Sequence, residues 1–400
     1  MGRVQWFVVL YVSFIHFIAF AHRMEVVPFF TDLKDTYQTG YAEIGGLVSA
    51  FLLGYAVFQI PAGTLADRYS PKRLILIGLL IMLSTSFLFT VTHSLLLSLF
   101  LRFLMGASSA MLFSPGIKLI SSFTPKEKRG MSIGILEAAA GMGMLLTLTI
   151  FPILSVYIEW NLLFVVLTII LLPVIALFGK VPGENQPVNE GQLERSKMPF
   201  LTLLKNPKVL RLMGIAFFGL FGLYGFIAWL PTYLETSIGY SKQETGIIMA
   251  VTMVSQVIMA PVSGKLSDWM GQRKATLIYG SFLMTISSLW LLLFHNMGIY
   301  FVAVLIGTGI SWSMAPMLTL ATEVVSVNKA GSVISIMNTV GQLASAISGF
   351  VYGMMYDWFG DFQMVWLGCL IAFVIRILFC LGDLENKRAI EQTDRKEVST

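Results

Sequence analysis

The sequence predicts an all-α membrane protein in which twelve transmembrane helices form two pseudo-symmetric six-helix bundles. Three observations lead to this fold class. Hydrophobic residues make up 56% of the 400 residues and charged residues only 12%, the apolar residues gather in twelve long segments, and a short motif of the first half recurs in the second. Because a soluble domain carries roughly 25% charged residues, most of this chain must face lipid or other buried helices.

Each of the twelve apolar segments is long enough to cross a hydrocarbon core of about 30 Å as a helix. In chain order they cover 4–24, 41–62, 74–93, 95–117, 131–153, 161–179, 210–233, 242–263, 275–294, 299–321, 331–355 and 362–382. The first segment resembles a secretory signal because an apolar run follows Arg3. It has no small-residue cleavage site, however, and eleven further spans come after it. We therefore expect it to remain in the protein as a helix.

A polar stretch at 180–209 separates six segments from six, and its content of Pro, Asn, Glu and Lys is typical of a flexible linker. The tail after Leu384 is polar as well. The sequence thus predicts four parts. They are an N-terminal six-helix bundle at 1–179, a cytoplasmic linker at 180–209, a C-terminal six-helix bundle at 210–384 and a cytoplasmic tail at 385–400.

Lysine and arginine predict the orientation in the membrane. If both termini are cytoplasmic, 21 of the 27 lysines and arginines lie in cytoplasmic loops and ends or at the cytoplasmic ends of segments, and only Lys34 and Lys242 lie on the outer side. This asymmetry follows the positive-inside rule. We expect a multi-pass protein of the cell membrane with both termini in the cytoplasm. The net charge of +5 then reflects topology and not nucleic-acid binding.

A recurring motif relates the two halves of the chain. The run GTLADRYSPKR at 63–73 returns in degraded form as GKLSDWMGQRK at 264–274, an offset of 201 residues that also pairs Gly106 with Gly307. Each copy follows one apolar segment and precedes another, so we expect each to form a short loop. Two similar halves built from apolar segments are typical of a transporter that arose by duplication.

Motifs of other protein classes are missing. The sequence has no zinc-ligand spacing, no glycine loop that would cradle phosphates and no nucleophile motif, so we expect neither an enzyme nor a bound cofactor or metal. Its two cysteines, Cys369 and Cys380, lie eleven residues apart on one predicted helix. That is roughly 16 Å along the axis and beyond disulfide reach. We expect both to be packing residues.

The two six-helix halves, the doubled motif and the run RFLMG at 102–106 resemble the major facilitator superfamily over nearly the whole chain. The resemblance implies that the motif gates the cytoplasmic side, where its carboxylate is favoured by a helix dipole. The expected gate residues are Gly63, Asp67, Arg68, Arg73, Gly264 and Asp268. Trp269 replaces the basic residue in the second copy, so we expect the first copy to dominate. A plain amphipathic turn is the alternative.

Further runs narrow the resemblance. AHRM around Arg23, LGYAVFQIPAG at 53–63 and WLPTYL at 229–234 are similar to the anion:cation symporter group, which moves organic anions such as aldonates and hexuronates with protons. That group commonly has an Asp before the first-helix Arg and an acidic residue on the fourth helix. Here His22 takes the first place and the fourth helix offers Ser109, so the proton site of the group does not carry over unchanged.

Two arginines inside the predicted helices point to an anion site. An Arg in a helix interior costs roughly 2.5–3.5 kcal/mol on insertion scales and normally faces a polar cavity. Arg23 and Arg102 come from helices that would line the central cavity of this fold, where two guanidinium groups could hold a carboxylate bidentately. Two alternatives remain open: Arg23 could reach out to water, and Arg102 could brace helix packing through backbone carbonyls.

Other polar residues share predicted inward faces. Tyr55 and Gln59, like Asn338 and Gln342, stand four residues apart, so each pair lies on one helix face. The 201-residue offset also pairs positions of the two halves, and relates Glu137 to Asn338, Tyr55 to Gln256 and Arg23 to Tyr224. The expected substrate-binding residues are Arg23, Tyr55, Gln59, Arg102, Tyr224, Gln256, Asn338 and Gln342. Interhelical hydrogen bonds, worth about 0.6 kcal/mol each, are the alternative role for the amides and tyrosines.

Glu137, the one carboxylate well inside a predicted span, is the expected proton-coupling residue. If it shares a cavity with an arginine, its protonation would free that arginine for the anion, so proton and substrate would bind cooperatively. His22 is the second candidate, since a protonated imidazole would add positive charge beside Arg23. A paired structural charge is the alternative role for Glu137.

These features predict a monomeric secondary transporter that imports a small organic anion of the carboxylate class with protons by alternating access. Helices 2 and 8 have no Arg and the interior of the seventh has none, which disfavours sugar-phosphate antiporters and nitrate porters, and the fifth lacks the Gly-Pro pair of drug:proton antiporters. The expected partners are the anion, protons and the lipid bilayer, with no nucleic acid. The main rival is a proton-driven exporter of a drug or metabolite, and a non-transporting membrane protein is the third class.

Overall fold

The structure, a computed structural model, forms helices and no strands in the residues that it describes, which are 2–125, 128–182, 206–270, 273–295, 297–323 and 327–382. Within these ranges the side chains of Asp67, Asp268 and most residues between 314 and 332 are left out of the description. Most of the predicted linker and tail, at 183–205 and 383–400, also lies outside the described residues.

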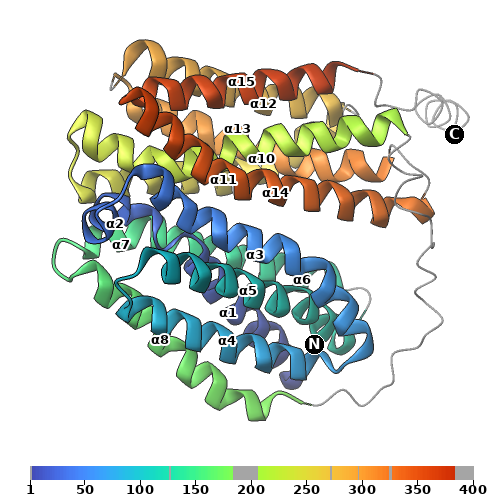
Figure 1. Cartoon of the computed structure of the whole chain (residues 1–400). Helices are drawn as coiled ribbons and strands as arrows, with labels where there is room; N and C mark the ends of the chain where they lie inside the picture. Colours follow the sequence, from blue (N-terminus) through green and yellow to red (C-terminus); the bar gives the residue numbers. More distant parts are fainter. Residues whose placement is uncertain are drawn as a thin grey trace, which may run out of the picture. The chain divides into compact units, whose positions relative to one another are not determined.

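The first half of the chain contains six long helices with short additions (Figure 1). In order they are α1 (Arg3–Met24), the 3₁₀ turn η1 (Val27–Phe29), α2 (Phe30–Tyr37), α3 (Tyr41–Arg68), α4 (Pro71–Val91), α5 (Leu95–Phe123), α6 (Arg129–Leu145), the π-helix η3 (Leu146–Ile150), α7 (Phe151–Leu154), α8 (Trp160–Leu177) and the 3₁₀ turn η4 (Phe178–Lys180).

The second half repeats this pattern. Its helices are α10 (Pro207–Tyr233), the π-helix η6 (Leu234–Ile238), α11 (Lys242–Met270), α12 (Arg273–Phe294), α13 (Ile299–Glu323), α14 (Val327–Phe359) and α15 (Phe362–Leu381). Eleven of the described helices or helix runs are long and apolar enough to cross a membrane, and α13 adds a shorter apolar stretch at Ile299–Ser313. The predicted all-helical membrane fold is therefore confirmed, and each predicted segment is found as a helix.

The duplicated motif does not form the loop that we expected. The residues from Gly63 to Arg68 continue α3, and α11 likewise runs through Gly264 to Met270. A glycine inside a helix costs only about 1 kcal/mol, which the long flanking helix outweighs. Proline at the first position of the next helix is favourable, so α3 ends just before Pro71 and the connection shrinks to two residues.

The chain divides into two compact units, which are treated separately below. Unit 1 comprises Met1–Glu190, Tyr224–Ala250 and Ser345–Val365, and unit 2 comprises Gly191–Leu223, Val251–Ala344 and Trp366–Thr400. Unit 1 therefore joins the first half of the chain to parts of α10, α11, α14 and α15. The predicted boundaries at 179, 209 and 384 stay a prediction.

Small residues bring the helices of unit 1 together. Gly54 on α3 and Gly106 on α5 lie so close to the facing backbone that a Cβ at either would collide with the carbonyl oxygen of Phe103 or Phe51. Gly143 on α6 meets the carbonyl oxygen of Phe17 on α1 in the same way. Figure 1 shows α3 running beside α5. Such contacts let backbones approach closely where lipid offers no hydrophobic driving force.

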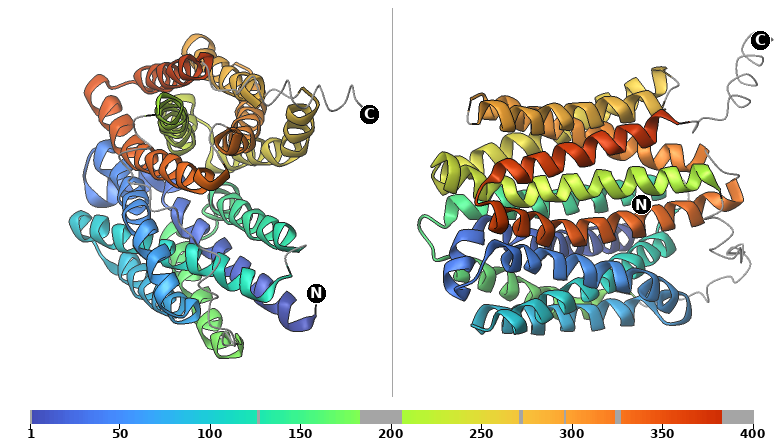
Figure 2. Two further views of the ribbon diagram at one scale, coloured as in Figure 1. Left: turned by 90° about the vertical axis from the view of Figure 1, so that its right-hand side faces the viewer. Right: turned by 45° about the horizontal axis from the view of Figure 1, so that its top comes forward.

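Unit 2 uses the same device at the repeated position. Gly307 on α13, the counterpart of Gly106, would collide through a Cβ with the carbonyl oxygen of Thr252 on α11. Gly280 on α12 and Gly309 on α13 also pack against each other. These helices can be followed by colour in the two views of Figure 2. The glycine pair that the 201-residue offset relates thus has one packing role in both units.

Candidate functional site

Arg23 lies in the last turn of α1 inside a box of aromatic rings. Its guanidinium carbon is 5.1 Å from the ring centre of Phe20, 5.3 Å from that of Tyr55 and 5.1 Å from that of Tyr224. All four residues belong to unit 1. Distances below about 6 Å give favourable cation–π contacts. Arg23 is only 3% exposed, so it does not reach out to water. Tyr224, which the 201-residue offset pairs with Arg23, also contacts it in space.

His16, which the sequence analysis missed, stands beside this box. It stacks on Phe113 with ring centres 5.0 Å apart, lies 4.7 Å from Phe20, and interacts electrostatically with Arg23. Its Nε2 is buried without a hydrogen-bond partner among the described residues. The available signal was the seven-residue spacing from Arg23, which puts both side chains on one face of α1.

Two further predicted residues gather near Tyr55 in unit 1. Glu137 on α6 interacts electrostatically with the Tyr55 hydroxyl, and its side chain is exposed. Gln59, one turn after Tyr55 on α3, is half-buried, and its Oε1 has no hydrogen-bond partner in the described part of the chain. The structure therefore brings together five of the predicted residues of unit 1, namely Arg23, Tyr55, Gln59, Glu137 and Tyr224.

The remaining predicted amides belong to unit 2. Gln256 lies on α11, and Asn338 and Gln342 lie one turn apart on α14. Each is partly exposed. The backbone carbonyl of Gln256 accepts a hydrogen bond of 2.5 Å from the Ser311 hydroxyl, which ties α11 to α13. The binding role of these three side chains stays a prediction.

Arg102 has a structural role: it braces helix packing, the alternative that the sequence left open. Its side chain is fully buried, and its guanidinium donates four hydrogen bonds within the protein. Nε donates to the Leu47 carbonyl at 3.2 Å, and Nη1 to the His22 carbonyl at 2.6 Å. Nη1 also meets Oε1 of Glu25 at 3.0 Å, and Nη2 donates to the Arg23 carbonyl at 3.0 Å. Four of its five N–H groups thus brace α1 and α3, and the guanidinium is not available as the fork that we expected to hold a substrate.

Glu25, the carboxylate that completes this brace, was also missed because the first predicted span ended at Met24. It is 1% exposed. Oε2 of Glu25 lies 2.8 Å from Nδ1 of His22, and Oε1 meets Arg102. Buried charges in proteins are normally paired and hydrogen-bonded. The three-residue spacing from His22 to Glu25, one helical turn, was the signal in the sequence.

The motif residues lie around the end of α3 and the matching end of α11. Gly63 and Gly264 are helical, and Arg68 and Arg73 are exposed. The side chains of Asp67 and Asp268 lie outside the described residues, so the gate stays a prediction. One contact was not expected: Nζ of Lys118 on α5 donates a hydrogen bond to the Ala66 carbonyl. A cation near the C-terminal end of a helix is stabilised by the negative pole of the helix dipole.

Within unit 1, segments from the second half of the chain pack against the beginning of α3. The carboxylate of Asp357 on α14 accepts hydrogen bonds from the backbone N–H groups of Tyr41 at 2.9 Å and Ala42 at 2.6 Å, which caps α3. Nearby, a Cβ at Gly45 would collide with the carbonyl oxygen of Gly349, and Nε1 of Trp229 donates to that same oxygen at 3.3 Å. We call these contacts the closure interface.

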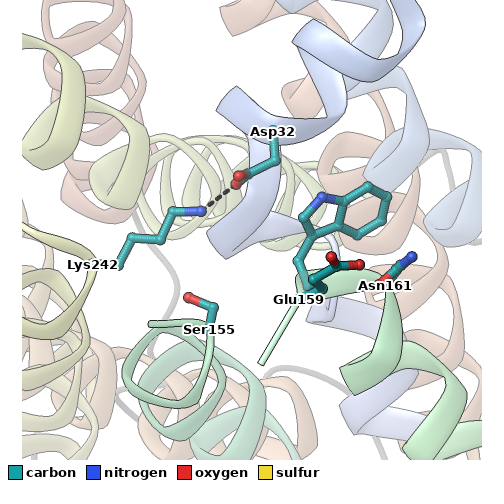
Figure 3. Close-up of a pocket in the computed structure, with 6 residues that line it drawn as sticks. Asp32, Ser155, Glu159, Asn161 and Lys242 are labelled. Carbon is teal, nitrogen blue, oxygen red and sulfur yellow. Dashed lines mark hydrogen bonds and ion pairs between the residues drawn. The ribbon is translucent and has the colours of Figure 1, made fainter. Parts of the chain in front are cut away.

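An ion pair lies in a pocket of unit 1. Nζ of Lys242 on α11 is 2.5 Å from Oδ2 of Asp32 on α2. A dashed line marks this pair in Figure 3. The other lining residues are Ser155, Glu159, Trp160 and Asn161. Glu235 of η6 interacts electrostatically with both partners of the pair. No group of three His, Cys, Asp or Glu residues in the described part of the chain could hold a metal ion.

Comparisons with known proteins agree with this arrangement. Residues 12–349 and 234–397 match the Major Facilitator Superfamily. The chain is 23% identical to the hexuronate transporter of Bacillus subtilis, with 83% of this chain and 84% of that protein covered. It is 24% identical to the probable galactarate/D-glucarate transporter GudP of the same organism, with 96% and 93% covered.

Among solved structures, the chain resembles a bacterial homologue of the human lysosomal transporter Spinster in its inward-facing, unoccupied conformation. The TM-score is 0.78 at 18% identity, and 95% of each chain is covered. This likeness supports the fold. The family match, together with the similar transporters, identifies the chain as a multi-pass membrane transporter, and not an enzyme, that belongs to the Major Facilitator Superfamily.

Proposed function

We propose that this transporter imports a small organic anion of the carboxylate class by proton symport and alternating access. It would act as a monomer in the cell membrane, with both termini in the cytoplasm. The observation that carries this proposal is the buried guanidinium of Arg23, boxed by Phe20, Tyr55 and Tyr224. The names of the similar transporters, for hexuronates and for galactarate or D-glucarate, favour a sugar acid as the substrate.

The box suits an anion because rings and carboxylates bind different parts of a guanidinium. Aromatic rings cover its faces, whereas a carboxylate binds its planar edge through two parallel N–H···O bonds. The rings around Arg23 therefore fix the orientation of the group without competing for that edge. Aromatic walls with a few placed polar groups are typical of small-molecule sites.

Polar groups near the box are suited to the hydroxyl groups of a sugar acid. His16 Nε2 and Gln59 Oε1 are buried polar atoms with no hydrogen-bond partner among the described residues. Such atoms are costly when they stay unsatisfied, so a hydroxylated ligand that bonds to them would gain affinity. We propose that Tyr55, Gln59 and Tyr224 contact the substrate beside Arg23, and that Gln256, Asn338 and Gln342 supply contacts from the second half. Arg102 is left out of this set.

Glu137 is the proposed proton-coupling residue of this site. It is close enough to Tyr55 to interact electrostatically, and Tyr55 contacts Arg23. Ionised Glu137 would compete with the anion for the positive charge of Arg23. Protonation removes this competition, so proton and anion would favour each other's binding, as linkage requires. During alternating access, the contacts of the closure interface would break in one state, and the contacts of the motif residues around Asp67 would break in the other.

Reconstitution into liposomes tests the proposed function. We expect the purified protein to accumulate radiolabelled D-glucuronate, D-glucarate or L-galactonate when the lumen is more alkaline than the medium, and a protonophore should abolish this accumulation. Uptake of none of the three acids would contradict the substrate class. Uptake that only equilibrates, whatever the pH gradient, would contradict symport. Efflux of a hydrophobic dye driven by the opposite gradient would favour the exporter.

A further inference from the structure

Arg376, near the end of α15 in unit 2, is a fully buried arginine that takes no part in the proposed anion site. Its side chain is 0% exposed. An arginine stays protonated in a protein, so Arg376 cannot shed its charge as a buried carboxylic acid or lysine can. A charge at membrane depth is normally paired, or it marks the path of a substrate or an ion. Arg376 therefore needs a negatively charged partner.

The described residues do not supply that partner. Nε and Nη1 of Arg376 have no hydrogen-bond partner among them, and Nη2 reaches only Sδ of Met317 on α13, at 4.0 Å. Unit 2 contains no aspartate or glutamate whose side chain is described. In Arg102 of unit 1, by contrast, four hydrogen bonds satisfy the guanidinium. Both edges of the Arg376 guanidinium that could hold a carboxylate or a phosphate are thus unused in the part of the chain that the structure describes.

Helix packing does not explain the arginine either. One turn before it on α15, the ring of Phe373 packs on Gly222 of α10, and one turn after it the ring of Phe379 also packs on α10. Arg376 packs on Gly219 between these contacts, and a Cβ at Gly219 would come within 2.7 Å of its Nε. Because apolar rings fill the positions on either side, an apolar side chain would suit position 376 without burying a charge.

Further cations lie where α10 and α12 meet the end of α15. Arg211 on α10 is packed over Gly382, and its Nη1 is buried with no hydrogen-bond partner in the described ranges. Nζ of Lys274 on α12 donates to the carbonyls of Leu381 at 3.2 Å and Gly382 at 3.0 Å. The negative pole of the α15 dipole favours cations at this end. Their positive potential also attracts anions toward Arg376.

We propose that Arg376 binds an oxyanion inside unit 2, either the carboxylate of an organic acid or the phosphate of an anionic lipid. Two oxygens of either group match two parallel N–H groups of the guanidinium. Met317 covers the site with an unbranched, flexible side chain, which can turn aside to admit the ligand. The site is separate from Arg23, which belongs to unit 1, and it depends neither on proton symport nor on the direction of transport.

Thermal unfolding of the detergent-purified protein tests this site without a transport assay. The probes are inorganic phosphate, D-glucarate and a short-chain phosphatidylglycerol, each titrated at constant ionic strength, with a short-chain phosphatidylcholine as the control lipid. A ligand that binds only the folded protein raises the unfolding temperature as its concentration exceeds its Kd. We expect such a rise with at least one probe. A rise with phosphate or D-glucarate identifies a soluble oxyanion, and a rise with phosphatidylglycerol alone identifies a lipid headgroup. No rise with any of the three would overturn the proposal.

Two substitutions separate Arg376 from Arg23 as the cause of the rise. Arg23→Ala should keep it, and the double variant Arg23→Ala with Arg376→Met should lose it. Because Arg376→Met removes a buried charge that has no partner, the ligand-free protein should unfold at the same temperature as the unaltered protein or at a higher one. A rise that Arg23→Ala abolishes would place the anion at Arg23 and overturn the proposal. Strong destabilisation by Arg376→Met would also overturn it, because a paired structural arginine behaves in that way.

Gly219→Ala tests the site while the charge stays in place, and it replaces Arg376→Met if that variant does not fold. The new Cβ would lie 2.7 Å from Nε of Arg376, so the guanidinium must shift. We expect the affinity for the active probe to fall roughly tenfold or more, as for the loss of one charged hydrogen bond. Gly134→Ala on α6, where a Cβ meets nothing within 4 Å, is the matched control. Equal affinity in both glycine variants would contradict binding at this guanidinium. If the unaltered protein transports no sugar acid, the proposed function fails, and these titrations still decide the role of Arg376.

Discussion

Arg23 and Arg102 are both buried in unit 1, yet their surroundings differ in kind. The guanidinium of Arg102 donates four hydrogen bonds, all to residues of the first half of the chain. The guanidinium of Arg23 is instead surrounded by rings, one of which, Tyr224, comes from the second half. Burial alone therefore does not mark an arginine as a ligand.

The difference also concerns conformational change. If the two halves of the chain move apart in alternating access, the partners of Arg102 move together, because they all lie within α1, the following turn and α3. The box of Arg23 would lose Tyr224 in such a movement. Arg102 then belongs to a rigid part of the first half, and Arg23 has an environment that can change with transport.

The largest expected effect is on stability. Arg102→Met should leave the Glu25 carboxylate buried without its guanidinium partner, and breaking a buried pair in this way costs about 3–5 kcal/mol. We expect a large drop in the thermal unfolding temperature of the detergent-purified protein, followed by tryptophan fluorescence. The matched control is Arg3→Met, on the exposed start of α1, which should change this temperature little.

The double variant Arg102→Met with Glu25→Gln sharpens the same point. It removes the stranded charge together with its partner, so part of the lost stability should return. If the double variant is as unstable as Arg102→Met alone, Arg102 stabilises the protein mainly through packing and its contacts with carbonyl groups, and the ion pair with Glu25 contributes little.

Arg23→Ala should show the opposite pattern, with transport lost and stability changed less than in Arg102→Met. Hydrogen bonds to charged groups contribute about 1.5–3 kcal/mol, which corresponds to roughly 10- to 150-fold in affinity for D-glucarate. Arg23→Lys keeps the charge but loses the planar fork. Its affinity for D-glucarate should therefore lie between that of the unaltered protein and that of Arg23→Ala. Uptake at limiting substrate concentration is the measurement, and near-normal uptake by Arg23→Ala would remove Arg23 from the proposed site.

Glu137→Gln should uncouple transport without weakening the anion site. The neutral amide resembles a protonated carboxyl group, so Arg23 stays available to the anion. We expect counterflow exchange to persist and accumulation under a pH gradient to disappear. Liposomes that exchange labelled against unlabelled D-glucarate measure the first quantity, and the same liposomes with an imposed gradient measure the second. A Glu137→Gln protein that still concentrates the acid would exclude Glu137 as the coupling group.

Asp357→Asn should loosen the closure interface and leave the surroundings of Arg102 unchanged. The carboxylate caps the beginning of α3 through two backbone N–H groups, and a charge at this helix end contributes about 0.3–1 kcal/mol. Hydrogen exchange of the peptide that contains Tyr41 and Ala42 should quicken a few-fold, while exchange around Arg102 should not change. Asp35→Asn, on the exposed side of α2, is the control. Equal acceleration in both regions would contradict the rigid brace.

The smallest expected effect is at the Lys242–Asp32 pair of Figure 3. Both side chains are 27% exposed, and partly exposed ion pairs contribute about 0–1 kcal/mol. Lys242→Met should lower the unfolding temperature slightly in low salt, and the difference should shrink at high salt because ions screen the pair. A salt-independent loss would indicate that Lys242 stabilises the pocket by packing, for example against the ring of Phe29.

Patterns that extend over the whole sequence were enough to predict the fold. Twelve apolar segments and the motif repeated after 201 residues predicted a helical membrane transporter of two similar halves, and the helices and the family match confirm the helical transporter fold. The reason is that lipid leaves a chain few solutions: every backbone polar group must be satisfied within a helix or a closed barrel. Arg23, Tyr55 and Tyr224 could be predicted as members of one site because repeat symmetry and helix faces are also visible in a sequence, and the structure brings the three side chains into contact.

The partners of individual charges are decided by tertiary structure. Nothing in the spacing of Arg102 distinguishes a ligand from a brace, because its four acceptors come from other segments, at His22, Arg23, Glu25 and Leu47. Glu25 was missed for the related reason that it lies just past an apolar run, where a charge is expected to meet water. It is buried because α5 supplies a guanidinium to it, and hydrogen-bond geometry over a few ångströms is set by packing between helices that are distant in the chain.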